Sequence, residues 1–180
     1  IDETLGFPLG DQAVDPDPVN GKIYSDQGSS GILEIDKISG TYRFLNPENG
    51  NQIAGFDTET SNLILHDTIN NDIIFFDTSS GISTVVDNDF ASQHSSWQAG
   101  GTHAYDARNR TLYVLNRDGN NTLLHSLDLK NLSENQLTLD RDFFQINFQK
   151  ESGKLYGISS AGSNNTHLFE INVTSGNSTQ

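Results

Sequence analysis

The fold of this chain is decided by Asn62-Leu63-Ile64-Leu65-His66, a polar turn, Asp72-Ile73-Ile74-Phe75-Phe76-Asp77, and then Ser80-Gly81. Short runs of β-branched and aromatic residues separated by polar turns are typical of adjacent antiparallel strands. Residues 52–57 before this stretch and 82–86 after it have the same character. The stretch therefore predicts a unit of four short strands.

The same outline occurs four times along the chain. In each unit an apolar run ends in a marker residue, and these markers are Asp36, Asp77, Asp128 and Asn172. They recur at intervals of roughly 40–50 residues, which is typical of repeat architectures. Ser-Gly follows three of the four markers a few residues later. We expect each marker side chain to accept backbone N–H hydrogen bonds from the turn that follows it.

A period of this length with four strands per unit predicts a β-propeller blade. We expect an all-β propeller of about four four-stranded blades. The last unit is expected to end before a fourth strand, so the ring is either closed by an N-terminal strand or part of a larger propeller. The expected divisions are an N-terminal strand and linker at 1–20 and repeats at about 21–50, 51–90, 100–142 and 143–180.

The third unit carries a family resemblance. Thr102-His103-Ala104-Tyr105-Asp106, followed by Arg110-Thr111-Leu112-Tyr113-Val114, resembles blades of the YWTD, NHL and related propeller families. Phe56-Asp57 begins the same outline in the second unit, although the YWTD tetrad itself is absent. The resemblance implies a propeller architecture and no particular activity, because propellers host many functions.

Composition excludes several classes of partner. The 180 residues include 10 Lys and Arg against 24 Asp and Glu, which gives a net charge of −14. Such a charge disfavours nucleic acid and anionic lipid, and no apolar run is long enough for membrane insertion. The absence of Cys excludes thiolate chemistry. Because Met is absent as well, little sulfur is open to oxidation, which favours an extracellular or cell-surface location.

The longest segment outside the repeat, residues 87–101, is the best candidate for a binding loop. It contains Phe90, His94 and the only tryptophan, Trp97. Function concentrates in loops held by a rigid scaffold, and exposed aromatic rings are favoured at contact sites. The alternative interpretation is that Trp97 packs between two blades as a core residue.

The five histidines show no tight metal-ligand spacing, and we interpret them as structural or surface residues. Four of them lie on or beside predicted strands, and they could meet only if their strand faces agree. The five are His66, His94, His103, His125 and His167.

One oxygen-rich segment makes calcium a candidate cofactor. Asn116, Asp118 and Asn120 flank Gly119 in a pattern that resembles calcium loops. The segment lacks a terminal bidentate acid, so the alternative interpretation is a hairpin turn of the Asp-Gly type. Asp15 and Asp17 form a second, weaker candidate.

Six Asn-x-Ser/Thr acceptor sites for N-glycosylation all follow residue 108. We expect glycans at some of the turn positions, with Asn172 the least suitable because it takes the place of a marker residue. The six are Asn109, Asn120, Asn131, Asn164, Asn172 and Asn177.

These observations predict a non-catalytic extracellular or cell-surface propeller module that binds a protein or a carbohydrate. Two alternatives remain open. One is a self-associating structural subunit of a surface filament or layer, and the other is a secreted propeller enzyme acting on glycans. The first would pair exposed edge strands between subunits, and the second would gather acids and histidines at the propeller channel.

Overall fold

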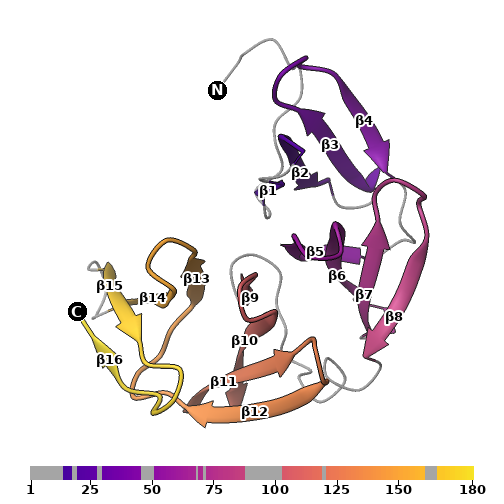
Figure 1. Ribbon diagram of the computed structural model, residues 1–180. Helices are drawn as coiled ribbons and strands as arrows, with labels where there is room; N and C mark the ends of the chain where they lie inside the picture. The colour runs from indigo at the N-terminus through magenta and orange to yellow at the C-terminus, as the bar shows by residue number, and fades with distance from the viewer. Residues whose placement is uncertain are drawn as a thin grey trace.

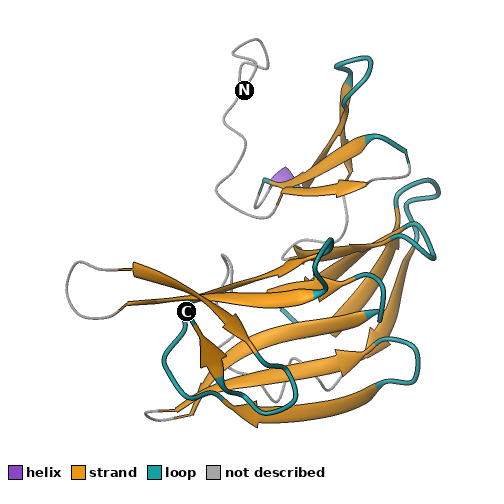
Figure 2. Ribbon diagram, turned by 60° about the vertical axis from the view of Figure 1, so that its left-hand side comes forward, coloured by secondary structure: helices purple, strands orange, loops and turns teal. Residues whose placement is uncertain are grey.

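A computed structural model gives the fold of the chain (Figure 1). It describes residues 14–17, 20–27, 30–45, 51–67, 69–70, 72–87, 103–118, 121–160 and 166–180. Strands and the turns between them make up nearly all of this part of the chain (Figure 2). Within the same part, no helix is long and apolar enough to cross a membrane.

Sixteen strands form four separate four-stranded sheets. Each sheet is an antiparallel meander, in which every strand pairs with the next one along the chain. Blade 1 contains β1 (Val14–Asp17), β2 (Lys22–Asp26), β3 (Ile32–Asp36) and β4 (Tyr42–Leu45). Blade 2 contains β5 (Asn51–Asp57), β6 (Asn62–Asp67), β7 (Asp72–Asp77) and β8 (Ser83–Asp87). Blade 3 contains β9 (His103–Asp106), β10 (Thr111–Asp118), β11 (Asn121–Asp128) and β12 (Ser133–Thr138). Blade 4 contains β13 (Gln145–Gln149), β14 (Lys154–Ser160), β15 (Thr166–Ile171) and β16 (Ser178–Thr179).

The four sheets are arranged as the blades of a β-propeller. The first strand of each blade lies toward the centre and the last toward the outside (Figure 1). β5 contacts β1 on one side and β9 on the other, and β9 in turn contacts β13. The predicted fold class, an all-β propeller of about four four-stranded blades, is confirmed.

Two segments differ from the expectations drawn from the sequence. Val14–Asp17, which was interpreted as part of a linker, forms the innermost strand of blade 1. Pro16 is tolerated there because β1 pairs only with β2, so the missing N–H lies on an unpaired edge. The expectation that the last unit ends before a fourth strand is wrong, since Ser178–Thr179 pairs with β15.

Apolar cores lie at three boundaries between successive blades, so the two middle sheets bury apolar side chains on both of their faces. Tyr24 and Ile32 of blade 1 pack with residues of β5 to β7 such as Leu63. At the next boundary Ile64 of blade 2 meets Leu112 of blade 3. The third core, between blades 3 and 4, contains the following residues: Ala104, Tyr113, Leu115, Leu124, Leu139, Phe143, Ile146, Leu155, Phe169 and Ile171.

All eight hairpins that join strand one to two, or three to four, of a blade share one backbone feature. In seven of them the residue with a positive φ angle stands four residues after the end of the preceding strand, and in the eighth, Gly176, it stands five residues after the end of β15. Glycine serves five of these positions because it has no Cβ to clash in that conformation. The eight residues are Gly21, Gly40, Ser61, Gly81, Arg110, Leu132, Gly153 and Gly176.

Candidate functional site

The marker residues cap the turns that follow them, as predicted. In Asp36, Oδ1 accepts hydrogen bonds from the backbone N–H groups of Ile38 and Ser39. Asp77 accepts from the backbone and hydroxyl groups of Ser79 and Ser80. These bonds, those from the serine hydroxyls first, hold the pKa of Asp77 well below its usual range. The markers are thus structural groups of the turns.

Asp128 and Asn172 make the same kind of cap in blades 3 and 4. Asp128 Oδ1 accepts from the N–H of Lys130. The side-chain oxygen of Asn172 accepts from the N–H groups of Thr174 and Ser175. Asp57 and Asp106 repeat the motif in the inner hairpins of blades 2 and 3.

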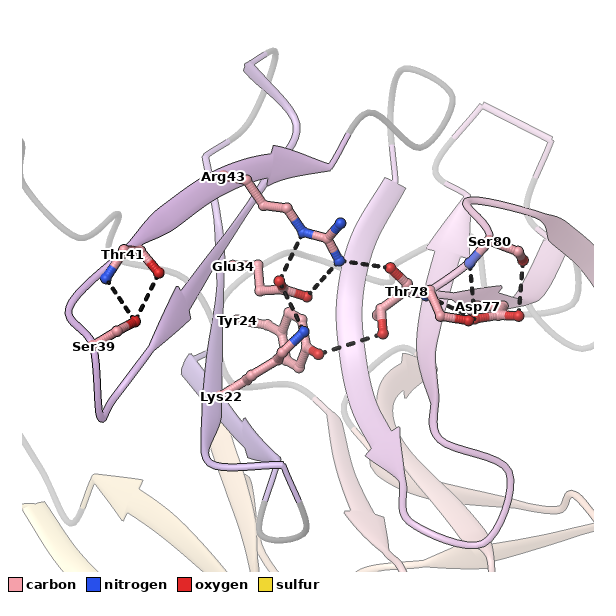
Figure 3. A network of polar contacts seen from close by, with 10 residues as sticks. Lys22, Tyr24, Glu34, Ser39, Thr41, Arg43, Asp77, Thr78 and Ser80 are labelled. Carbon is pink, nitrogen blue, oxygen red and sulfur yellow. Dashed lines mark hydrogen bonds and ion pairs between the residues drawn. The ribbon is translucent and has the colours of Figure 1, made fainter.

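A polar network joins blade 1 to blade 2 (Figure 3). Arg43 donates from Nε and Nη2 to the two carboxylate oxygens of Glu34, at 2.7 and 3.1 Å. Its Nη2 also donates to the backbone oxygen of Thr78 in blade 2, at 2.8 Å. Lys22 Nζ lies 3.0 Å from Glu34 Oε1. Burial raises the pKa of Glu34, but Arg43 and Lys22 outweigh burial and lower it overall.

A more deeply buried ion pair joins blade 2 to blade 3. Arg110 Nη2 lies 2.8 Å from Asp57 Oδ2, and the two side chains are only 12% and 0% exposed. Arg110 also lies over the ring of Phe75. Burial, followed by the Asp57 charge, raises the pKa of the Tyr105 phenol beside this pair. The pair fixes the position of the two blades relative to each other.

Sequence reasoning missed this ion pair because its partners lie far apart in the chain. One signal was present in the sequence: Arg110 stands at a turn position of the repeat that glycine occupies in most of the other turns, and the structure gives it the same positive φ angle. A non-glycine residue is strained there by about 1–2 kcal/mol. An arginine at a glycine position of the repeat indicates that its side chain is needed.

The described histidines lie at three different places. His66 of β6 is 2% exposed and lies close enough to His103 of β9 to interact with it electrostatically across the boundary between blades 2 and 3. His103 and His125 are both cross-strand neighbours of Val114, so they share the sheet face directed toward blade 2. His167 lies on blade 4, with Nδ1 3.0 Å from Gln180 Nε2.

Burial keeps His66 and His103 neutral near pH 7. Burial, followed by the charge of His103, lowers the pKa of His66 to about 4, and the nearby Asp67 opposes this shift. Burial also lowers the pKa of His103, although a hydrogen bond to the backbone of Ile53 opposes this. Among the described residues, no group of three or more His, Cys, Asp or Glu could hold a metal ion.

The predicted binding residues Phe90, His94 and Trp97 lie outside the described residues. The structure nevertheless fixes the two ends of their segment. Asp87 ends the outermost strand of blade 2, and His103 begins the innermost strand of blade 3. The segment therefore joins the same two blades that the Arg110–Asp57 pair connects. The binding role of these three residues stays a prediction.

The predicted calcium segment takes part in a hairpin. Asp118 pairs with Asn121 and Asn116 with Leu123, so β10 and β11 are joined by the two residues 119 and 120. This pairing matches the alternative interpretation of an Asp-Gly turn. Asn116 and Asp118 are two residues apart on one strand, and Asn120 lies outside the described part. Calcium binding here stays a prediction.

Four of the six glycosylation acceptors belong to the described part of the chain, and all four are exposed. Asn109 lies in the β9–β10 hairpin, where its Nδ2 donates to Asp106 Oδ2 at 2.7 Å. Asn131 lies in the β11–β12 turn, and Asn172 and Asn177 flank the β15–β16 turn. Asn120 and Asn164 lie outside the described residues.

Comparison with known proteins supports the fold and leaves the family open. No family model and no curated protein matches the chain. Among solved structures, it is similar to TolB from Acinetobacter baumannii, with 16% identity and a TM-score of 0.64 over 90% of this chain and 41% of that one. A chain of the nidogen–laminin complex is similar at 12% identity and a TM-score of 0.63, over 89% of this chain and 71% of that one. Puromycin hydrolase is similar at 13% identity and a TM-score of 0.58, over 93% of this chain and 28% of that one.

These similarities place the chain among β-propeller repeat proteins by fold. The chain spans about two fifths of the TolB chain, and identities this low show architecture alone. The finer resemblance to YWTD and NHL blades remains a prediction from the sequence.

Proposed function

We propose that the chain is an extracellular or cell-surface propeller module that binds a protein or a carbohydrate. Its contact site is the segment between β8 and β9, with Phe90, His94 and Trp97 as the binding residues. The observation that carries the proposal is the position of this segment. It joins the outer edge of blade 2 to the centre of blade 3, at the boundary locked by the Arg110–Asp57 ion pair.

Binding residues often belong to loops that a rigid part of the fold holds at both ends, and we call this rigid part the base. Here the base consists of the apolar core between blades 2 and 3 and the ion pair beside it. The segment is also longer than the connections 46–50 and 139–144 between the other blades. Aromatic side chains in such loops supply contact area at a low cost in conformational entropy.

One structural relative supports a protein partner. The similar chain at a TM-score of 0.63 was solved as part of a nidogen–laminin complex, in which two proteins bind each other. Another similar chain is a hydrolase, so the fold is compatible with both binding and catalysis. We favour binding because no local nucleophile or paired-carboxylate motif occurs in the sequence.

The contact site is tested by array binding with two variants. The purified chain, Trp97→Ala and Tyr42→Ala are applied to a glycan array and to an array of extracellular protein domains. Tyr42 is the matched control, because it is an exposed aromatic residue on the outer strand of blade 1. We expect specific spots that disappear with Trp97→Ala and persist with Tyr42→Ala. Equal binding by both variants, or no binding on either array, would refute the proposed site.

The extracellular location is tested by modification. We propose that some of Asn109, Asn120, Asn131, Asn164 and Asn177 carry glycans, with Asn172 the least suitable because its side chain caps a turn. Intact-mass measurement on protein from its native source should exceed the mass of the bare 180-residue chain. An enzyme that removes N-linked glycans should restore the bare mass. A bare mass before treatment would remove this support for a secretory origin.

A further inference from the structure

Three of the four described histidines lie at the boundary between blades 2 and 3. His66 pairs with Ile73, which belongs to the apolar core of this boundary, so His66 lies on the side of blade 2 that faces blade 3. Val114 of the same core pairs with both His103 and His125. The three rings therefore come from the facing sides of two sheets. We call His66, His103 and His125 the histidine cluster.

The histidine cluster is enclosed by the two blades. His66 is 2% exposed and His125 is 5% exposed. His103 is half-buried, and it makes a hydrogen bond with the backbone of Ile53 on the innermost strand of blade 2. That bond lies next to a β-bulge between Ile53 and Gly55, where the strand departs from its regular pairing. A histidine of blade 3 is thus fastened directly to blade 2.

The surroundings compensate a positive charge on the cluster only in part. Cross-strand pairing gives His66 and His125 neutral neighbours, Gln52 and Gln136. Asp67 follows His66, but its carboxylate already accepts three hydrogen bonds from the turn at residues 69–70. Asp72 pairs with Asp67, and Asp87 and Asp118 end β8 and β10 at the same edge of the two sheets. The described ionisable groups near the opposite edge of this boundary are Asp57, Glu59, Asp77, Tyr105, Arg110 and Glu134.

Protonation of the cluster is unfavourable while the two blades stay packed. Burial, followed by the charge of His103, outweighs Asp67 and lowers the pKa of His66 from 6.5 to about 4. Burial lowers the pKa of His103 as well. Because both values are lower in the folded chain, the neutral rings stabilise the boundary fully above about pH 6.5. This stabilisation is lost as the pH falls from there toward the folded-state pKa values.

We propose that the histidine cluster makes the boundary between blades 2 and 3 sensitive to acid: when His66 and His103 take up protons, the two blades separate there while blades 3 and 4 stay packed. Two positive rings held close together repel each other, and separation lets water solvate both charges. The proposal concerns the conformation of the fold, and it is independent of whether the segment between β8 and β9 binds a partner.

A thiol placed at the boundary reports whether the boundary opens. The chain contains no cysteine, so Ala54→Cys introduces a single thiol into the core between blades 2 and 3. Ala104→Cys is the matched control, because this alanine is equally buried but belongs to the core between blades 3 and 4. Both variants are labelled with a dipyridyl disulfide between about pH 7 and pH 4.5, a range that spans histidine titration. Each rate is divided by that of a free thiol at the same pH.

The labelling rate of Ala54→Cys should rise about tenfold for each pH unit below about pH 6, as expected when opening takes up one proton. The rate of Ala104→Cys should stay low. Adding His66→Gln and His103→Gln to Ala54→Cys should remove the rise, whereas adding His167→Gln, on blade 4, should leave it. Equal rises at both alanines, no rise at Ala54→Cys, or a rise that persists without His66 and His103 would overturn the proposal.

A titration of the unmodified chain provides a test that needs no folded histidine variant. Nuclear magnetic resonance of the histidine rings should show His66 and His103 still neutral at about pH 6, where a solvated histidine is already largely protonated. The two rings should take up protons only over the pH range in which Ala54→Cys becomes reactive. Protonation near pH 6.5, or protonation of both rings while Ala54→Cys stays protected, would refute the coupling between charge and opening.

Discussion

The boundary between blades 1 and 2 and the boundary between blades 2 and 3 use the same kinds of contact in different settings. Each has an apolar core and an arginine–carboxylate pair. At the first boundary Arg43 is 51% exposed, and both members of its pair belong to blade 1. At the second boundary the pair crosses between blades and is largely excluded from water.

The comparison shows how position decides the energetic role of a salt bridge. The pair with an exposed partner contributes less, because water solvates the Arg43 guanidinium when Glu34 is lost, although Glu34 itself is only 7% exposed. A buried pair is costly to break, because the remaining charge is left without compensation. The boundary between blades 2 and 3 is therefore the one at which loss of a carboxylate, Asp57, should be most costly.

The largest expected effect comes from Asp57→Ala. Loss of this carboxylate leaves the buried Arg110 guanidinium with the more distant and exposed Glu59, 3.8 Å from its Nε, at a cost of up to about 3–5 kcal/mol in the free energy of unfolding. Urea denaturation measures the change. The double variant Asp57→Ala, Arg110→Met should recover part of the loss, because no orphan charge remains. A loss no larger than that of Glu34→Ala would remove the distinction between the two boundaries.

A steric change at the same boundary should have an intermediate effect. A Cβ added at Gly55 would lie 2.6 Å from the Cβ of Tyr105 in blade 3, closer than real contacts allow. Gly55→Ala should therefore cost about 1–3 kcal/mol as the blades are forced apart. At the other boundary, Tyr24→Phe removes a long hydrogen bond of 3.5 Å to Thr78 and should cost less, about 1 kcal/mol. Thermal melts of both variants check this order, which equal melting temperatures would contradict.

The network of Lys22, Glu34 and Arg43 should make the stability of the chain depend on pH. The pKa of Glu34 lies below its usual 4.5 in the folded state, so its ionised form stabilises the fold above that pH. This contribution is lost as the pH falls through the lowered pKa. Between about pH 5 and pH 3, the wild type should lose more stability than Glu34→Gln, which has no carboxylate to protonate. Parallel acid titrations of the two proteins would count against this account.

The smallest effect is expected at Ser61, which occupies the same turn position in blade 2 as Arg110 does in blade 3. Ser61 and Arg110 both have positive φ angles at equivalent hairpin positions, but Arg110 also holds Asp57. Ser61→Gly should stabilise the chain by up to about 1 kcal/mol, because it relieves backbone strain. Arg110→Gly should destabilise it, since the relief is smaller than the loss of the ion pair. Stabilisation by both glycines would show that the pair is dispensable.

Much of the fold could be predicted because its determinants are local. The strand of residues 72–77 is predicted by a short run of β-branched and aromatic residues between polar turns, and it is β7. The marker Asp77 was expected to cap its turn because an aspartate before Ser-Ser-Gly has backbone donors within reach, and it does. The strand Val14–Asp17 was missed because Pro16, with Pro18 just after it, resembles a linker, and only pairing with β2 makes it a strand.

The candidate site was less predictable because it depends on contacts between distant residues. No sequence pattern places Asp57 beside Arg110, or His66 near His103, since each pair joins different blades. The likeness of Tyr156 to Tyr113 could be read from the repeat. Tyr113 is buried against a neighbouring blade, whereas Tyr156 is only half-buried. This difference follows only from the order of the blades in space.

The sequence by itself determined the repeat, the strands and the capped turns. Short apolar runs and turn residues fix these features because both depend on contacts between residues close together in the chain. The tertiary structure alone decided which sheet faces form the core, which ion pair is buried and which side chains of blade 4 are exposed. Those properties depend on how each sheet packs against the next. Burial then sets the energy of every charge and apolar side chain at the boundary.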